Sequence, residues 1–365
     1  MALTGAMSAG ISGLKAHMEA LNTVGNNIAN VNTYGYKPGR VTFRESMYST
    51  QSAGAAGTAT VGGTNPRQTG YGTSVGTIDL DMSSKSLEST GQTLDMAIQG
   101  DGFFLVGPKN LTFDSPDDFK SLSLSRVGDF KFDADGYLVD GGGNVVYGFL
   151  NSTGTQNPAV EPDATSVSTV LVPIRLPLAE EGTGATIYPG YTQDSTANTP
   201  STSVSAPAAG TDVGNGVTTN GDTINYDSLQ IDENGCITCV NSDTEKPVVV
   251  GYIALGIVEN PNGLVHAGEC YYTAGEAAGD LTITTSNSAV TGYLNNPANT
   301  ADLDDGLRLL SGSSTSLMSG FLEASGTDLA QEFANMIVYQ RGYQANTRIV
   351  TVTDSMLEEL VNMKR

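Results

Sequence analysis

The N-terminal part of the chain carries a long helical pattern. From residue 7 to residue 31, large apolar residues follow gaps of three and four, which predicts one apolar stripe along an amphipathic helix. The stripe consists of Met7, Ile11, Leu14, Met18, Leu21 and Ile28. Its polar face carries asparagine, with Asn22, Asn26 and Asn30 four residues apart. Asparagine is a mediocre helix former that hydrogen-bonds well, so this face suits an interface.

A longer pattern of the same kind occupies the C-terminal part. Apolar residues stand seven residues apart, with one more on a flanking stripe, at Leu329, Phe333, Met336, Tyr343, Val350 and Leu357. This length predicts one continuous helix from about 327 to about 362. A helix with a single apolar stripe needs a partner, and neither helix has one nearby in the sequence. We expect the two helices to pair with each other and with neighbouring chains. Two ordinary surface helices on a globular core are the alternative.

Between the helices the pattern changes to that of strands, with alternating or short continuous apolar runs. The segments expected to form strands are 77–82, 94–98, 102–106, 130–132, 137–139, 170–178, 228–240, 248–258 and 281–285. A turn of Asp and Gly over 133–136 makes 130–139 a hairpin. Residues 151–222 are rich in Thr, Ser, Pro and Gly.

The order of these patterns predicts a mainly β protein with long N- and C-terminal α-helices that form a coiled-coil-like base. The chain leaves this base and returns to it, so the domains are discontinuous. We expect a terminal helical polymerisation domain of 1–45 plus 320–365 and a loosely structured connector of 46–76. An inner β domain of 77–150 plus about 286–319 would carry an outer β domain of 151–285 with the Thr/Ser-rich insertion.

Composition and charge narrow the function. Of the 365 residues 39% are hydrophobic, which excludes a wholly disordered chain. The formal net charge is −22, so nucleic acid and anionic membranes are poor partners. Both ends are close to neutral, and residues 46–319 hold 9 basic against 31 acidic side chains. No stretch suits membrane insertion and no cleavable leader is recognisable, so we expect a protein that stays in the cytosol or leaves by another route.

No catalytic constellation is recognisable, so we expect no enzyme activity and no cofactor. The sequence has two histidines; His17 lies within the N-terminal helix, where we expect a surface or interhelical role. The acidic turn Asp133-Ala134-Asp135-Gly136 suggests a calcium loop only superficially. It lacks the third ligand before the glycine and the distal glutamate, so a hairpin turn is the preferred interpretation.

One group of residues could hold a metal. Cys236 and Cys239 form a C-x2-C pair, and His266 and Cys270 follow as an H-x3-C pair. Tetrahedral zinc uses four soft ligands in two such pairs. Each pair also lies within expected β structure, where cysteine is often buried apolar filler. Free or buried thiols are the preferred interpretation, and a disulfide or a zinc site are the alternatives.

Several separated motifs, in order along the chain, resemble the bacterial flagellar axial proteins of the rod and hook group. The N-terminal signature is Ile28-Ala29-Asn30-Val31-Asn32-Thr33-Tyr34-Gly35-Tyr36-Lys37. Internal motifs are the segment 94–104 and Arg126-Val127-Gly128-Asp129-Phe130. The tail motif, Gln340-Arg341-Gly342-Tyr343-Gln344-Ala345-Asn346-Thr347-Arg348, is most similar to that of the hook proteins.

This resemblance implies a structural subunit that assembles through its terminal helices into a tubular homopolymer. It further implies export through the flagellar type III apparatus and an extracellular place in the hook or basal body. Its partners would be copies of itself and the distal rod, hook cap and hook-filament junction proteins. Within the family we expect a hook subunit, because 151–319 supplies an extra outer domain; a distal rod protein is the alternative. A secreted adhesin or a zinc-binding surface protein is the competing class.

Overall fold

The computed structural model describes residues 2–58, 60, 62–109, 111, 118–133, 137–150, 171–174, 178–179, 186–187, 224–241, 247–286, 290, 308–309 and 315–363. The chain forms two compact units. The terminal unit consists of Met1–Asp81 with Ser325–Arg365, and the inserted unit consists of Met82–Ala324. None of the helices in the described part of the chain is long and apolar enough to cross a membrane.

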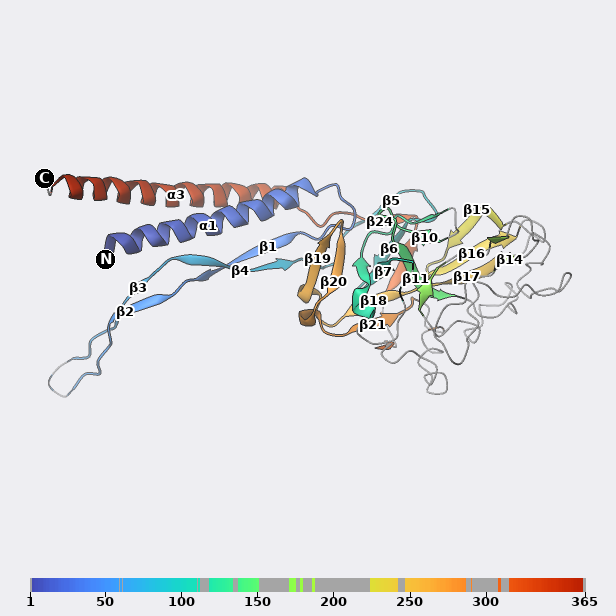
Figure 1. Ribbon diagram of the computed structural model, residues 1–365, viewed down its shortest axis with the longest axis horizontal. Coiled ribbons are helices and arrows are strands. Elements are labelled where there is room, and N and C mark those ends of the chain that lie inside the picture. The colour runs from blue at the N-terminus through green and yellow to red at the C-terminus, as the bar shows by residue number, and fades with distance from the viewer. Residues whose placement is uncertain are drawn as a thin grey trace. The chain divides into compact units, whose positions relative to one another are not determined.

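Two long helices dominate the terminal unit (Figure 1). Helix α1 spans Ala2–Ala29 and helix α3 spans Leu329–Asn362, so the prediction of two long terminal helices is confirmed. Helix α3 begins where the Asp328 carboxylate accepts hydrogen bonds from the N–H groups of Ala330 at 2.9 Å and Gln331 at 3.2 Å. This N-cap satisfies backbone donors that have no partner inside the helix.

Glycines bring α1 and α3 into close contact. A Cβ atom at Gly13 of α1 would lie 2.8 Å from the side-chain amide of Asn346 in α3. On the facing helix, a Cβ atom at Gly342 would lie 2.6 Å from the His17 ring. A larger residue at either place would force the facing side chain to move, so glycine at both positions favours the close contact between the helices.

A β-ribbon makes up the rest of the terminal unit. Strand β1 (Gly39–Glu45) pairs with β4 (Thr73–Leu80), and β2 (Tyr48–Ser52) pairs with β3 (Arg67–Gly70), both antiparallel. The prediction of a loosely structured connector over 46–76 is wrong at these strands. Polar cross-strand pairs join β2 and β3, since Gln51 donates to Thr69 at 3.1 Å and Gln68 donates to Thr50 at 3.2 Å. Such pairs stabilise a ribbon without an apolar alternation that the sequence would reveal.

The inserted unit consists mainly of short strands (Figure 1). They are β5 (Leu87–Ser89), β6 (Met96–Gln99), β7 (Phe103–Gly107), β8 (Ser123–Ser125), β9 (Lys131–Phe132), β10 (Leu138–Val139), β11 (Val145–Leu150), β12 (Val172–Pro173), β13 (Leu178–Ala179), β14 (Thr186–Ile187), β15 (Ile224–Ile231), β16 (Cys236–Asn241), β17 (Pro247–Ile253), β18 (Leu255–Val258), β19 (Leu264–Gly268), β20 (Tyr271–Ala274), β21 (Leu281–Thr284), β22 (Arg308–Leu309), β23 (Ser316–Ser319) and β24 (Phe321–Glu323). In the described part of this unit, short 3-10 helices also occur, namely η1 (Asp118–Ser121), η3 (Pro261–Gly263) and η4 (Glu276–Ala278).

One large sheet organises these strands. Its path runs β15-β16-β17-β11-β7-β18-β21-β22, and further strands join this path at its side. Separate pairs are β5 with β24, β6 with β23, and β13 with β14. The core is apolar, and the rings of Phe104 and Phe130 meet edge to face with centroids 4.9 Å apart. Beside them Gly128 is obligatory, because a Cβ atom there would overlap the carbonyl oxygen of Met96.

The inserted unit confirms most of the expected strands and corrects one. The pairing of β9 with β10 confirms the hairpin, although turn residues 134–136 lie outside the described residues. The single strand expected over 170–178 is wrong, because β12 already ends at Pro173. The predicted boundary between the inner and outer β domains, at residue 150, coincides with the end of β11. Strand β11 belongs to the predicted inner domain, yet it pairs with β17 of the predicted outer domain. Described strands of both predicted β domains therefore share one sheet, while most of the Thr/Ser-rich insertion lies outside the described residues.

Candidate assembly surface

Asn27, near the end of α1, joins this helix to the following segment and to α3. Its side chain is 1% exposed and every polar atom of its amide is used. Oδ1 accepts from the Gly39 N–H at 3.0 Å and from the Tyr36 hydroxyl at 3.1 Å. Nδ2 donates to the Gly39 carbonyl at 2.8 Å and to the Glu332 carboxylate at 3.1 Å. A buried amide satisfied in this way fixes the relative position of three segments.

The signature segment 29–37 forms the turn that ends α1. Thr33 Oγ1 donates to Asn30 Oδ1 at 3.1 Å, and the Thr33 carbonyl accepts from the Tyr36 N–H. Gly35 has a φ of 68°, which glycine adopts without steric cost. Gly35, Tyr36 and Lys37 are all buried. The signature therefore has a structural role, which is to reverse the chain tightly against α1.

The same turn also contacts the segment that leads into α3. The Tyr36 carbonyl accepts a hydrogen bond from the Gly326 N–H at 3.0 Å. Together with the bond from Asn27 to Glu332, this bond ties the two terminal segments at one end of the helix pair.

The tail motif lies mostly on the outside of α3. Its half-buried members are Gly342, Asn346 and Thr347, and Asn346 packs over Gly13 of α1 and donates to the Gly342 carbonyl at 3.0 Å. The exposed residues of the tail motif are Gln340, Arg341, Tyr343, Gln344, Ala345 and Arg348, and those of the N-terminal signature are Ala29, Asn32 and Tyr34. Within the terminal unit only part of the motif therefore serves the contact between the helices.

The two terminal helices contact each other as expected, but within the terminal unit the large residues of the predicted apolar stripes are not the most buried residues. The buried residues of α1 are mostly small, namely Gly10, Gly13, Ala16, Ala20, Val24 and Asn27. The half-buried stripe residues are Met7, Leu14, Leu21, Ile28, Met336, Val350 and Leu357. The exposed stripe residues are Ile11, Met18, Leu329, Phe333 and Tyr343. Close approach of the backbones leaves no room for large side chains in the contact, so they lie at its flanks or outside it.

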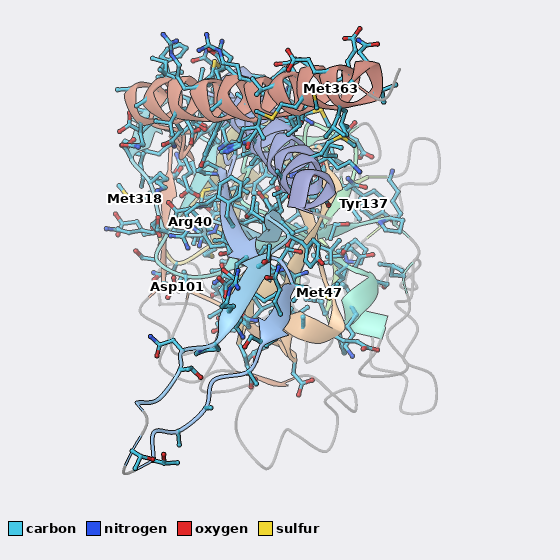
Figure 2. The ribbon with its side chains drawn as sticks, turned by 90° about the vertical axis from the view of Figure 1, so that its left-hand side faces the viewer. Arg40, Met47, Asp101, Tyr137, Met318 and Met363 are labelled. Carbon is cyan, nitrogen blue, oxygen red and sulfur yellow. The ribbon has the colours of Figure 1, made fainter. Side chains whose placement is uncertain are left out.

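A further set of apolar residues on α3 is exposed and was not singled out from the sequence. This open stripe consists of Val338, Ala345, Ile349, Val352, Met356 and Leu360. Val338 is 63% exposed, and Val352 follows it at two heptads. Met363, labelled in Figure 2, marks the C-terminal end of this helix. Contiguous exposed apolar surface of this kind marks an interaction site.

An aromatic group joins the helix pair to the ribbon. The His17 ring lies 5.5 Å from the ring of Phe43 on β1 and 6.2 Å from that of Tyr339 on α3, and the latter two rings are 5.9 Å apart. Of the two roles expected for His17, at the surface or between helices, the structure shows the interhelical one. Its buried Nδ1 has no hydrogen-bond partner within the described residues.

The four zinc candidates do not form a metal site. Cys236 and Cys239 lie on β16, His266 lies on β19, and Cys270 stands in the turn before β20. Within the described residues no group of three or more His, Cys, Asp and Glu side chains is placed to hold a metal ion. All three cysteines are free and buried, which also overturns the disulfide alternative. The His266 ring instead accepts a hydrogen bond from the Gly268 N–H at 3.0 Å.

Burial also makes these thiols poor nucleophiles. Desolvation raises the pKa of Cys236 and of Cys239 to about 12 each. The thiolate is the reactive and metal-binding form of cysteine, and it is strongly disfavoured at neutral pH in both places. The cysteines therefore act as apolar core residues.

Two family models match the ends of the chain. Residues 318–363 match "Flagellar basal body rod FlgEFG protein C-terminal", and residues 7–37 match "Flagella basal body rod protein". These ranges contain all of α3 and most of α1 with its following turn.

Known proteins resemble the chain over almost its whole length. The flagellar basal-body rod protein FlgG of Bacillus subtilis (strain 168) is 32% identical over 356 residues, which cover 98% of this chain and 97% of that protein. The flagellar hook protein FlgE of Borreliella burgdorferi is 25% identical over 469 aligned residues, 97% of this chain and 98% of that protein. The flagellar hook protein FlgE of Salmonella typhimurium is 27% identical over 455 aligned residues, which cover 98% of this chain and 99% of that protein.

Proposed function

Because this chain belongs to the family of flagellar hook and rod proteins, we propose that it is a structural subunit of the bacterial flagellar hook that polymerises through its terminal helices. The observation that carries the proposal is the open stripe on α3. The open stripe lies beside the contact with α1 and remains exposed, although Ile349 at its edge reaches Gly10 of α1.

The occupant of the open stripe is a second copy of the same chain. Each Val, Ile, Leu or Met side chain that becomes fully buried contributes about 1.5–3 kcal/mol, and the stripe offers several in a row along one helix. Contacts between unlike patches of identical subunits generate an open helical polymer when the rotation between subunits does not close into a ring. The exposed members of the predicted stripes, such as Met18 and Phe333, supply the complementary apolar surface.

The surroundings of such a subunit follow from its place in the flagellum. Its neighbours at the ends of the polymer are the distal rod, hook cap and hook-filament junction proteins. Export through the flagellar type III apparatus and an extracellular location complete the proposal. The acidic middle of the sequence, with 9 basic against 31 acidic side chains over 46–319, suits a solvated outer surface.

Electron microscopy of flagellar remnants from a strain without this gene tests the proposal. Rods that are complete to their tip but carry no hook are expected, and the intact gene supplied in trans should restore the hook. Missing or truncated rods would instead assign the chain to the distal rod, which is the alternative within the family. Intact hooks and filaments would contradict both assignments.

A further inference from the structure

The inserted unit contains a buried ion pair between Arg126 and Glu323. The two side chains are 2% and 1% exposed, and Nη1 of Arg126 lies 3.4 Å from Oε2 of Glu323. Nη2 of Arg126 donates to the Gly100 carbonyl at 3.0 Å, and the guanidinium lies 5.2 Å from the ring centroid of Phe103. Arg126 is thus held by the segments around β6 and β7 and presents its charge to Glu323.

Glu323 is fixed to the neighbouring strand as well. It lies at the end of β24 and pairs with Leu87, the first residue of β5. Its Oε1 accepts a hydrogen bond from the Lys85 N–H at 2.9 Å. One residue further, the Ala324 N–H donates to the Ser86 carbonyl at 2.9 Å. The ion pair therefore sits at the outermost residue pair of β5 and β24.

This position decides how a pulling force acts on the inserted unit. The covalent connections between the two units are 81–82 and 324–325. Because β5 and β24 are antiparallel, both connections join the same end of the strand pair. A force through them opens the pair from its outermost residues, one pair at a time, and is not shared among all of its hydrogen bonds. Resistance at the start therefore depends on the Ala324–Ser86 hydrogen bond and then on the pair formed by Leu87 and Glu323.

We propose that Arg126 and Glu323 form a latch that keeps the inserted unit closed against force applied through its two connections. The inference rests on the proposed function, because a hook that transmits torque loads its subunits in this way. Once the Ala324–Ser86 hydrogen bond has opened, the strands cannot separate further until the Glu323 carboxylate leaves the buried guanidinium. Each charge then lacks both its partner and full hydration. Arg126 is a positioning residue, since it acts on the strand pair by holding Glu323.

Single-molecule pulling of the full-length chain tests the latch. Handles are attached at Asp81→Cys and Ser325→Cys, because the buried native thiols do not compete for the label in the folded protein. The test variant carries Arg126→Met and Glu323→Gln, and its glutamine keeps an acceptor for the Lys85 N–H. Neutral replacement of a buried ion pair often leaves equilibrium stability nearly unchanged. We expect an unchanged urea midpoint and a lifetime under constant force that is shorter by about tenfold or more.

A matched control separates the latch from charge removal in general. Lys109 forms an ion pair with Asp133 at 2.7 Å that is partly exposed, so Lys109→Met should leave the lifetime under force unchanged. Should this double variant fail to fold, Arg126→Gln with Glu323→Gln takes its place with the same expectation, because it also removes both charges together.

Two outcomes would overturn the latch. The first is a double variant whose lifetime under force equals that of the parent protein. The second is a double variant whose lifetime falls only in proportion to a fall in its urea midpoint. Failure of the proposed function is separately visible, because the pulling result does not depend on whether the chain builds hooks in cells.

Discussion

At the scale of single residues, buried polar groups and glycines decide how the segments of this protein meet. Asn27 joins the end of α1, the following turn and α3 through four hydrogen bonds. Gly13 and Gly342 allow the two helices to approach closely. These residues add little apolar area, so their importance lies in geometry and in leaving no buried polar group without a partner.

Replacing Asn27 by aspartate tests this joint. The carboxylate would lose both donated hydrogen bonds and stand against the Glu332 carboxylate, now 3.1 Å from Asn27 Nδ2. We expect a loss of at least about 2 kcal/mol in the free energy of unfolding, measured with urea at neutral pH. The matched control is Asn22→Asp on the exposed side of the same helix, which should change stability by less than about 0.5 kcal/mol. Equal effects of the two substitutions would contradict the assigned role.

The buried cysteines predict a sensitivity to alkaline pH. Desolvation raises the pKa of Cys236 and of Cys239 from 9.0 to about 12, while the unfolded chain keeps the ordinary value. Stability contributed by the neutral thiols is therefore fully present below pH 9 and is lost as the pH rises from 9 towards 12. Within that window each thiol lowers the free energy of unfolding by about 1.4 kcal/mol per pH unit. Urea unfolding between pH 8 and pH 11 measures this slope.

The control for this slope is the volume-conserving substitution Cys239→Val. This substitution removes one titrating thiol. It should therefore reduce the pH dependence of the free energy of unfolding by about 1.4 kcal/mol per pH unit. An identical slope in the parent and in Cys239→Val would refute the prediction.

At the scale of elements, the terminal helices separate two kinds of contact. The side of α1 with small residues packs within the terminal unit, and large apolar residues of both helices lie at the flanks or are exposed. A helix that used its large residues for its own partner would have none left for neighbouring copies. Because small residues of α1 make the contact with α3, large apolar side chains of both helices remain available for contacts with neighbouring copies.

Substitution within the open stripe of α3 tests this division. Val352→Asp places a charge where a neighbouring copy would have to desolvate it, so we expect polymerisation to be abolished. Because Val352 is 50% exposed, circular dichroism of the monomer should be unchanged. Gln344→Asp introduces the same charge at an exposed position of the same helix outside the open stripe and should still polymerise. Sedimentation and electron microscopy of purified protein measure the difference, and normal polymers of Val352→Asp would remove the open stripe from the interface.

At the scale of the whole molecule, the chain combines nearly neutral ends with a strongly acidic middle. The net charge of −22 makes copies repel each other, whereas the terminal helices offer apolar surface for attraction. Assembly then depends on two opposing contributions. Burial of apolar surface acts at short range and favours assembly, whereas electrostatic repulsion between the acidic subunits acts at longer range and is screened by salt.

This balance predicts that salt promotes polymerisation. Raising the ionic strength from about 0.01 M to about 0.15 M shortens the Debye length from roughly 30 Å to roughly 8 Å. We expect the critical concentration for polymerisation of the purified chain to fall over this range, as measured by sedimentation. A neutral osmolyte at equal osmolality serves as the control and should not reproduce the salt response. A critical concentration that rises with salt would show that ion pairs between copies dominate the assembly.

The sequence predicted those parts of the fold whose periodicity is long or whose apolar runs are continuous. Helix α3 and strand β7 were found for this reason. The ribbon strands β2 and β3 were missed, because polar pairs such as Gln51 with Thr69 leave no hydrophobic period. The Arg126–Glu323 pair was also missed, since its partners are far apart in the chain and nothing in either local pattern indicates the other. The zinc hypothesis failed because close spacing in the sequence did not bring both pairs of candidates together.

The sequence by itself determined the long helices at the two ends, the strands between them, the acidic middle and the family resemblance. These follow from local periodicity, composition and short motifs, which need no knowledge of distant contacts. Only the tertiary structure decided which side of each helix is buried, because small residues such as Gly13 reveal a close contact only when the facing residue is known. It also decided that Glu323 stands against Arg126, since the burial of a charge depends on the packing of segments that the sequence keeps apart.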